Sequence, residues 1–241
     1  MLRKILFFFI LLFSTNSIAI QVTAKSWLVT DGEGNIIDQQ NIESKRPIAS
    51  ITKLMTAMVV LDSNSNLDEK LDKVNLTRRQ MIQLSLVKSD NRSAALLCKF
   101  YPGGWNACIE SMNRKAMKLG MCDTSFDDST GLSRNNISSA KDLIRLVKEA
   151  EKYPEIVEAS QTSNLKIKTK KKKWTVVHNT NPIIGHRHHF IVSKTGFTNP
   201  AGGCIVMMLD TKFGRRIVVL LGSRNTRTRI PEAEFIALKA A

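Results

Sequence analysis

Three short patterns in this 241-residue chain combine residue types that can cleave an amide bond. The first is Ser50-Ile51-Thr52-Lys53, in which a hydroxyl and an amine stand three residues apart. On a helix, that spacing puts both side chains on one face within hydrogen-bond reach. A neutral lysine can then remove the serine proton and activate the oxygen as a nucleophile. The pattern alone is weak, because the chain repeats it at Ser85/Lys88, Ser138/Lys141 and Ser163/Lys166.

The segment that follows Ser50 distinguishes this copy from the others. Residues 50–61 are dominated by Leu, Met, Ala and Val, which predicts a buried helix. The amides at a helix start favour developing negative charge, and burial lowers the pKa of a lysine by disfavouring its charged form. We therefore expect Ser50 to be a nucleophile and Lys53 its base. The alternatives are a simple helix cap at Ser50 and a solvated helix lysine at Lys53.

Two further patterns supply groups that could handle a substrate amide. Ser89-Asp90-Asn91 places a hydroxyl and an amide between two predicted helices, where they could relay a proton and hold a carbonyl. The same residues could simply cap the second helix. Lys194-Thr195-Gly196 occurs once, at the end of an apolar strand, where glycine lets a substrate approach the backbone closely. The alternative there is a charged strand end.

The elements that must position these residues change from strand to helix and back to strand. Strands are predicted at residues 24–29, 36–40, 190–195, 203–210 and 216–222, with a lysine-rich hairpin over 165–177. Helices are predicted at residues 50–61, 77–87, 91–100, 105–119 and 139–153, the last capped by Ser139, and another opens at Pro231. This order predicts an α/β (α+β) fold in which an antiparallel sheet is built from both termini and a helical lobe is inserted into it.

The start of the chain has the three parts of a secretory signal. Arg3 and Lys4 are followed by an apolar run over residues 5–13 and by the small-residue site Ser17-Ile18-Ala19. The run is shorter than the roughly 20 residues that a membrane span needs. We therefore expect residues 1–19 to be removed, leaving a soluble mature protein over residues 20–241 that forms a single domain with two lobes.

The charge of the chain suits an anionic partner. The formal net charge is +15 at pH 7, while 43% hydrophobic and 24% charged residues are ordinary for a globular protein. An exported chain meets little nucleic acid, so we expect none as a partner, and a carboxylate-rich cell-wall polymer fits better. The alternative is a basic surface that only keeps the protein soluble.

Four cysteines in an exported chain could form disulfides, and four allow three connectivities. Cys98 and Cys108 flank the turn at residues 101–104, so we favour them as a pair. Cys122 and Cys204 are far apart in the sequence. They could pair, and buried free thiols are an equally good interpretation.

The three patterns stand in the order found in class A β-lactamases and penicillin-binding proteins. The chain resembles the low-molecular-mass penicillin-binding proteins of the D-alanyl-D-alanine peptidase family, and most of all its endopeptidase branch. The resembling stretches are residues 47–56, 89–92, 129–133 and 194–198. Together they span nearly all of the mature chain, and the fold that the resemblance implies is the β-lactamase/DD-peptidase-like one.

The resemblance implies a periplasmic serine peptidase that cleaves peptidoglycan stem peptides after D-alanine, without a cofactor or metal, and that β-lactam antibiotics inhibit covalently. Ser50 would form the acyl-enzyme, with Lys53 as base. Ser89 would relay a proton to the leaving amine, and Asn91 would orient Lys53 and the substrate amide. The remaining roles fall mainly on one strand. The Phe197 N–H would complete an oxyanion hole with the N–H of Ser50. Lys194, beside Gly196, would supply positive potential, and the hydroxyls of Thr195 and Thr198 would bind a carboxylate of the substrate.

Four alternatives stay open. A D-alanyl-D-alanine carboxypeptidase would break the same type of bond, but such relatives often carry an extra C-terminal domain and an amphipathic anchor helix, so we expect no membrane anchor here. A class A β-lactamase would need a Glu-x-x-x-Asn loop between the second and third patterns, and the chain has none there. A zinc peptidase would use His186, His188 and His189, and a non-catalytic wall-binding protein would use the lysine run at residues 168–173.

Overall fold

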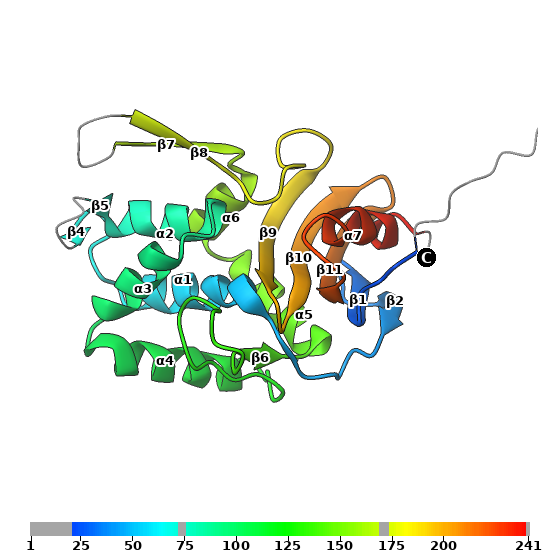
Figure 1. Ribbon diagram of the computed structural model, residues 1–241, viewed down its shortest axis with the longest axis horizontal. Coiled ribbons are helices and arrows are strands. Elements are labelled where there is room, and N and C mark those ends of the chain that lie inside the picture. The colour runs from blue at the N-terminus through cyan, green and yellow to red at the C-terminus, as the bar shows by residue number, and fades with distance from the viewer. Residues whose placement is uncertain (1–20, 72–75, 169–173, 240–241) are drawn as a thin grey trace, which may run out of the picture.

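The computed structural model describes residues 21–71, 76–168 and 174–239 (Figure 1). Its main sheet is antiparallel with strand order β2-β1-β11-β10-β9. The N-terminal segment supplies β1 (Ser26–Asp31) and β2 (Ile36–Gln40), and the C-terminal segment supplies β9 (His189–Thr198), β10 (Gly202–Thr211) and β11 (Gly214–Ser223). The pairing of β1 with β11 joins the two segments. The prediction of a sheet built from both ends of the chain is therefore confirmed.

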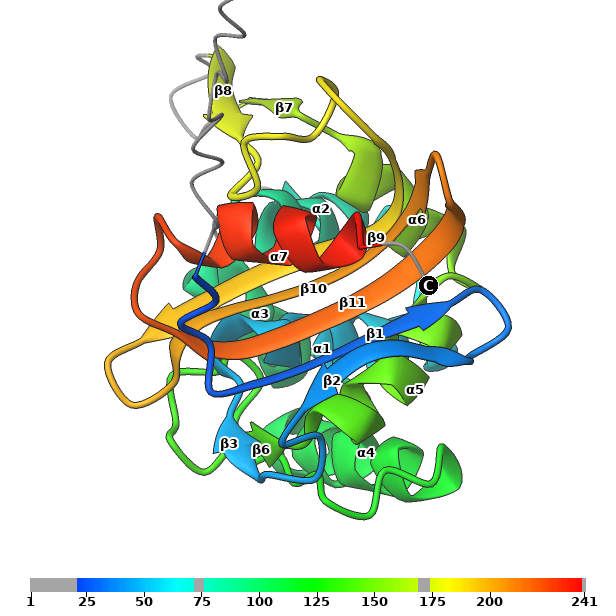
Figure 2. The same cartoon turned by 90° about the vertical axis from the view of Figure 1, so that its right-hand side faces the viewer.

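Both faces of the sheet are covered, which explains the long apolar runs of β10 and β11. Along β10, Ile205 and Met207 pack in one cluster with α7 (Arg229–Ala237), which lies across the sheet in Figure 2. Val206 and Met208, on the opposite face, pack in the large cluster of the helical lobe. The predicted helix at Pro231 begins two residues earlier, at Arg229.

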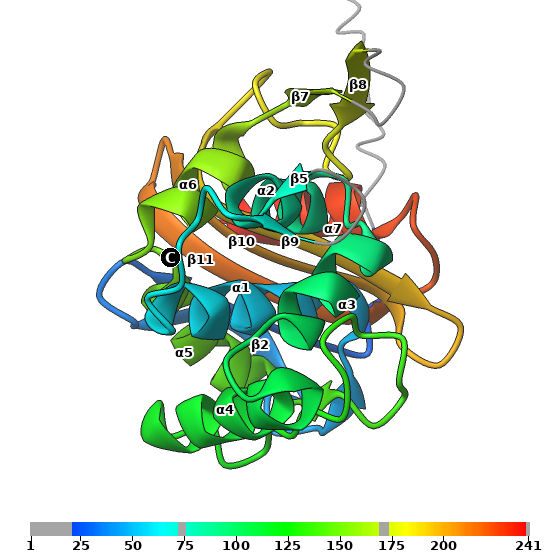
Figure 3. The same cartoon turned by 90° about the vertical axis from the view of Figure 1, so that its left-hand side faces the viewer.

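The helical lobe is organised around α1 (Thr52–Asp62), which follows the short 3-10 turn η1 (Ala49–Ile51). All residues of α1 except the last two are buried, as expected for its apolar sequence. The helices around it are α2 (Arg78–Val87), α3 (Asn91–Lys99), α4 (Gly104–Lys118) and α5 (Ala140–Ala150), seen together in Figure 3. Every helix predicted in this part of the chain is present.

Local capping interactions set where several of these helices begin and end. The Thr77 hydroxyl and the Gln80 side chain form a reciprocal capping box at the start of α2. The Ser139 hydroxyl accepts from the Asp142 amide and caps α5, as predicted. The helix predicted over residues 139–153 ends earlier, because Pro154 starts a separate helix, α6 (Pro154–Gln161), which the sequence analysis missed.

Short strand pairs complete the structure. The predicted hairpin consists of β7 (Asn164–Lys168) and β8 (Trp174–His178), and most of the lysine run between them lies outside the described residues. Two further pairs are β3 (Arg46–Pro47) with β6 (Ile137–Ser138), and β4 (Lys70–Leu71) with β5 (Leu76–Thr77). The predicted secretory signal also lies outside the described residues. Within them, no helix has the length and apolar character needed to cross a membrane.

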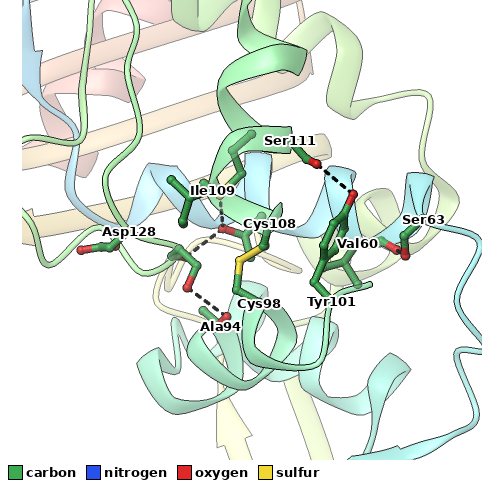
Figure 4. The surroundings of a disulfide bond; sticks show 12 residues. Val60, Ser63, Ala94, Cys98, Tyr101, Cys108, Ile109, Ser111 and Asp128 are labelled. Carbon is green, nitrogen blue, oxygen red and sulfur yellow. Dashed lines mark hydrogen bonds between the residues drawn. A yellow bond between two sulfur atoms is a disulfide. The ribbon is translucent and has the colours of Figure 1, made fainter. Parts of the chain in front are cut away.

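The predicted disulfide between Cys98 and Cys108 is confirmed, and it joins α3 to α4 (Figure 4). Cys122 and Cys204 are both free thiols. Cys204 is buried, as the second interpretation expected, and burial raises the pKa of its thiol to about 11. The expectation that Cys122 is buried was wrong. It lies in the turn after α4, and its side chain is exposed.

Candidate active site

The structure brings Ser50 and Lys53 together at the start of α1. Ser50 lies in η1 and Lys53 in the first turn of α1, and Lys53 Nζ donates to Ser50 Oγ over 2.8 Å. The other copies of the pattern do not form this pair. Ser85 Oγ donates to the Ile82 carbonyl, and Lys88 is exposed. The Ser50 copy alone has its lysine buried, because only this copy begins a helix at the centre of a lobe.

Lys53 is fully buried and surrounded by oxygen atoms. Besides Ser50 Oγ, its amine donates to Asn91 Oδ1 over 2.7 Å and to the Thr130 carbonyl over 2.5 Å. Desolvation lowers the pKa of Lys53 to about 8, against the opposing effect of Asp128 and Asp90. A neutral amine keeps two N–H donors, which suffice for Asn91 and Thr130. Its lone pair is then left to accept the proton of Ser50.

Ser89 lies between this pair and the third pattern. Lys194 Nζ donates to Ser89 Oγ over 3.0 Å and to the Thr195 carbonyl over 3.0 Å. Lys194 is also buried, and desolvation lowers its pKa well below the usual lysine value, with the charges of Lys53 and Arg229 acting in the same direction. Ser89 has a φ of 60°, a left-handed conformation that non-glycine residues adopt at a cost. The backbone between α2 and α3 is thus bent sharply where the hydroxyl meets Lys194.

The strand β9 forms the edge of the sheet and passes close to Ser50. A Cβ atom on Gly196 would lie 3.0 Å from the Ser50 amide nitrogen, so glycine is what allows this approach. The Phe197 side chain is exposed, and Thr198 Oγ1 accepts from the Ala201 amide. Thr195 Oγ1 donates to Thr180 Oγ1 over 2.7 Å. The structure therefore places every predicted site residue on η1, α1, the α2–α3 junction or β9.

Several residues that hold the site together were not predicted from the sequence. Asp128 accepts from the backbone amides of Thr130, Gly131 and Ser133, and so fixes the loop whose Thr130 carbonyl contacts Lys53. The Asn136 amide donates to Thr52 Oγ1 and ties the same loop to α1. The stretch at residues 129–133 was noticed by resemblance, but no local pattern marks a backbone carbonyl as a ligand of a lysine.

Arg229, at the start of α7, is the other group that sequence analysis missed. It is buried, and its Nη1 donates to the Gly196 carbonyl over 2.7 Å, behind the strand that faces Ser50. The C-terminal segment contains several arginines, and nothing in the sequence distinguishes Arg229 as the one that contacts Gly196. Only the packing of α7 on the sheet brings it to β9.

The histidines considered for zinc point to separate partners. His188 Nε2 lies 3.2 Å from Glu234 Oε1, and His189 Nδ1 lies 3.1 Å from Asp210 Oδ2. Among the described residues, no group of three or more His, Cys, Asp or Glu side chains is arranged to hold one metal ion. These histidines therefore do not converge on a common ligand.

Comparison with protein families and curated proteins gives a consistent picture. The model of the D-alanyl-D-alanine carboxypeptidase family matches residues 13–75 and 70–225. A D-alanyl-D-alanine endopeptidase of Pseudomonas aeruginosa is 41% identical over 208 residues, covering 78% of this chain and 67% of that protein. One from Escherichia coli is 40% identical over 209 residues, with the same two coverages. A D-alanyl-D-alanine carboxypeptidase of Bacillus subtilis is 27% identical over 226 residues, covering 84% of this chain and 58% of that protein.

Solved structures with the same fold belong to related proteins. The ampicillin-bound form of a penicillin-binding protein from Listeria monocytogenes matches with a TM-score of 0.79 and 27% identity, covering 91% of this chain and 98% of that chain. A DD-transpeptidase of Streptomyces matches with a TM-score of 0.83 and 25% identity, covering 90% and 96%. The predicted fold class is therefore confirmed.

Gly131 offers a test of how the loop at residues 129–131 supports Ser50. Its φ is +84°, and a Cβ there would lie 1.9 Å from the Ala49 carbonyl oxygen. We expect Gly131→Ala to lower the free energy of unfolding by about 3 kcal/mol or more, because backbone strain adds to a clash with backbone. The measurement is urea unfolding of each variant.

Gly214→Ala is the matched control, since Gly214 has a φ of +90° and open space where its Cβ would stand. Gly214→Ala should lower the free energy of unfolding by about 1–2 kcal/mol, the strain of the left-handed conformation alone. Equal losses for the two variants would show that the loop is not packed against Ala49.

Proposed function

The chain belongs to the D-alanyl-D-alanine carboxypeptidase family and is a serine-type D-alanyl-D-alanine peptidase, and we propose that its preferred reaction is endopeptidic. In this proposal it hydrolyses the bond between D-alanine and the diamino acid that cross-links two peptidoglycan stem peptides. The catalytic group is assigned to Ser50 with Lys53 as its base. The observation that carries the assignment is the 2.8 Å contact between Lys53 Nζ and Ser50 Oγ in a buried site.

Acylation begins when Ser50 Oγ attacks the D-alanyl carbonyl carbon and its proton passes to Lys53 Nζ. The carbonyl oxygen becomes negative and is received by the backbone N–H groups of Ser50 and Phe197. When the C–N bond breaks, Ser89 Oγ donates a proton to the leaving nitrogen and takes up the one that Lys53 removed from Ser50, so that Lys53 is neutral again. Asn91 keeps Lys53 in place and accepts from its amine throughout.

Deacylation releases the product and restores the enzyme. A water molecule attacks the ester carbon as one of its protons passes to Lys53. When the Ser50 Oγ–carbon bond breaks, Lys53 returns this proton to Ser50 Oγ, and the product leaves with a new D-alanyl carboxyl group. A β-lactam acylates Ser50 in the same way, but its amine stays tethered beside the ester and obstructs water. We therefore propose β-lactam antibiotics as covalent inhibitors, which the ampicillin-bound Listeria relative supports.

Lys194 and Thr195 are assigned to the carboxylate next to the scissile bond. A carboxylate beside Lys194 raises the pKa of this buried amine and favours its charged form. That charge in turn favours the neutral form of Lys53, because two nearby amines repel when both are protonated. Thr198 can help, since its hydroxyl accepts from Ala201 and still has a proton to donate.

Endopeptidase specificity is supported by the relatives. Those near 40% identity are named endopeptidases, whereas the carboxypeptidase of Bacillus subtilis is 27% identical. The alternative within the family is release of a terminal D-alanine from uncross-linked pentapeptides. The signal-like residues 1–19 and the wall substrate together support a periplasmic location.

Penicillin labelling tests whether Ser50 is the nucleophile. A fluorescent penicillin should label the mature wild-type protein stably, because the acyl-enzyme is hydrolysed slowly, and Ser50→Ala should take no label. Ser85→Ala, which removes the serine of another Ser-x-x-Lys copy, should label like the wild type. Gel fluorescence before and after a chase in buffer measures both effects. Label that drains within seconds would instead support a β-lactamase.

The pH dependence of acylation tests whether Lys53 is the base. Only neutral Lys53 can take a proton, so the acylation rate should rise with pH and level off above a pKa of about 8. Lys53→Ala should fold normally and lose about 10⁴-fold or more in acylation rate. Stopped-flow acylation from pH 5 to 10 measures the profile. Lys88→Ala, the lysine of another copy, should leave it unchanged, and a flat wild-type profile would assign the base to another group.

The relative rates on two peptidoglycan substrates test the endopeptidase assignment. Purified enzyme should split cross-linked dimeric muropeptides faster than it removes the terminal D-alanine of pentapeptide monomers. Liquid chromatography with mass spectrometry follows both reactions, and Ser50→Ala is the control for contaminating activity. Release of D-alanine with dimers left intact would replace the endopeptidase assignment with carboxypeptidase.

A further inference from the structure

A groove of about 1030 Å³ runs beside α7, on the face of the sheet that α7 covers. One wall is the loop that follows β8, and the other is the start and outer side of α7. Its lining includes Thr180, Arg187, Arg227, Arg229, Phe235 and Lys239. Two of these residues, Thr180 and Arg229, also contact β9 next to the candidate site.

The groove begins where the proposed carboxylate site ends. Thr195 lies opposite Ile205, whose side chain packs in the cluster under α7, so the Thr195 side chain is on the α7 face of the sheet. The neighbouring Lys194 is on the other face, toward Ser89. Thr195 Oγ1 is 2.7 Å from Thr180 Oγ1, and Thr180 lines the groove. A chain that leaves the scissile bond past Thr195 therefore continues past Thr180 into the groove.

The charge of the groove suits an anionic ligand. Four cations line it, against the single carboxylate of Glu234. Glu234 lies beside His188 and 3.8 Å from Arg187, and Lys239 donates to Asp38 outside the groove. Arg227 is exposed at the rim. Apolar side chains, among them Ile230 and Phe235, supply contact area for the rest of a peptide.

We propose that this groove binds the leaving stem peptide of the cross-link, recognised through its free carboxylates. The inference rests on the proposed endopeptidase function, and it adds a binding site for the part of the substrate that lies beyond the scissile bond. When a cross-link is cut, the leaving amine belongs to a diamino acid that still carries a whole second peptide. When a terminal D-alanine is removed, the leaving group ends at its carboxylate and has nothing to place in the groove.

Charge reversal at the rim tests the proposal. Arg227→Glu should raise KM for a cross-linked dimeric muropeptide roughly tenfold, as expected for a repulsive charge at a binding surface. It should leave penicillin acylation and D-alanine release from pentapeptide unchanged, because those leaving groups do not reach Arg227. A dimer whose leaving stem has its carboxylates amidated should be cleaved equally by the variant and the wild type.

Arg224→Glu is the matched control, since Arg224 is an exposed arginine three residues away that does not line the groove. It should cleave the dimer like the wild type. An Arg227→Glu enzyme with an unchanged KM for the dimer would overturn the proposal, as would an equal loss for Arg224→Glu. A wild type that releases D-alanine but leaves dimers intact would refute the endopeptidase function itself, and the two failures are thereby distinguished.

Discussion

A buried lysine amine held by three oxygen atoms is the constraint on which the rest of the structure depends. Lys53 Nζ contacts three oxygen atoms: Ser50 Oγ in η1, Asn91 Oδ1 at the start of α3 and the Thr130 carbonyl oxygen in a distant loop. An amine removed from water in this way is costly unless its donors are all satisfied. The helical lobe must therefore bring three separate segments to one point, and the burial of α1 up to Val60 is consistent with that requirement.

The second buried amine, that of Lys194, affects which of the two site lysines is protonated. Lys194 approaches Ser89 from the sheet as Lys53 approaches Ser50 from the helical lobe, so each hydroxyl has its own lysine. Burial opposes the charged form of both amines, and their repulsion opposes charging them together. In the proposed mechanism, a carboxylate ligand favours the charged form of Lys194. Lys53 then stays neutral and acts as the base.

Much of the fold could be predicted from the sequence, because its signals are local, whereas the candidate site residues were predicted from the order of three individually weak patterns and from a family resemblance. Apolar runs mark the strands, the Ser139 cap marks α5, and the turn between Cys98 and Cys108 favours their pairing. The missed features depend on contacts between distant segments. The Thr130 carbonyl and Arg229 act through packing that no pattern encodes, and α6 is a short helix set apart from α5 only by Pro154.

The sheet topology has a consequence for the order in which the enzyme can be assembled. Trp27, near the start of the described chain, lies opposite Leu220, near its end, and β9 reaches the sheet only through β10 and β11. Contacts between the ends of a chain close the largest loop and form late in folding. Ser50 and Lys53 belong to the helical lobe, whereas Lys194 lies on β9, near the end of the chain in sequence order. Lys194 meets Ser89 only after these C-terminal strands have paired, so a chain that is still being synthesised has an incomplete candidate site.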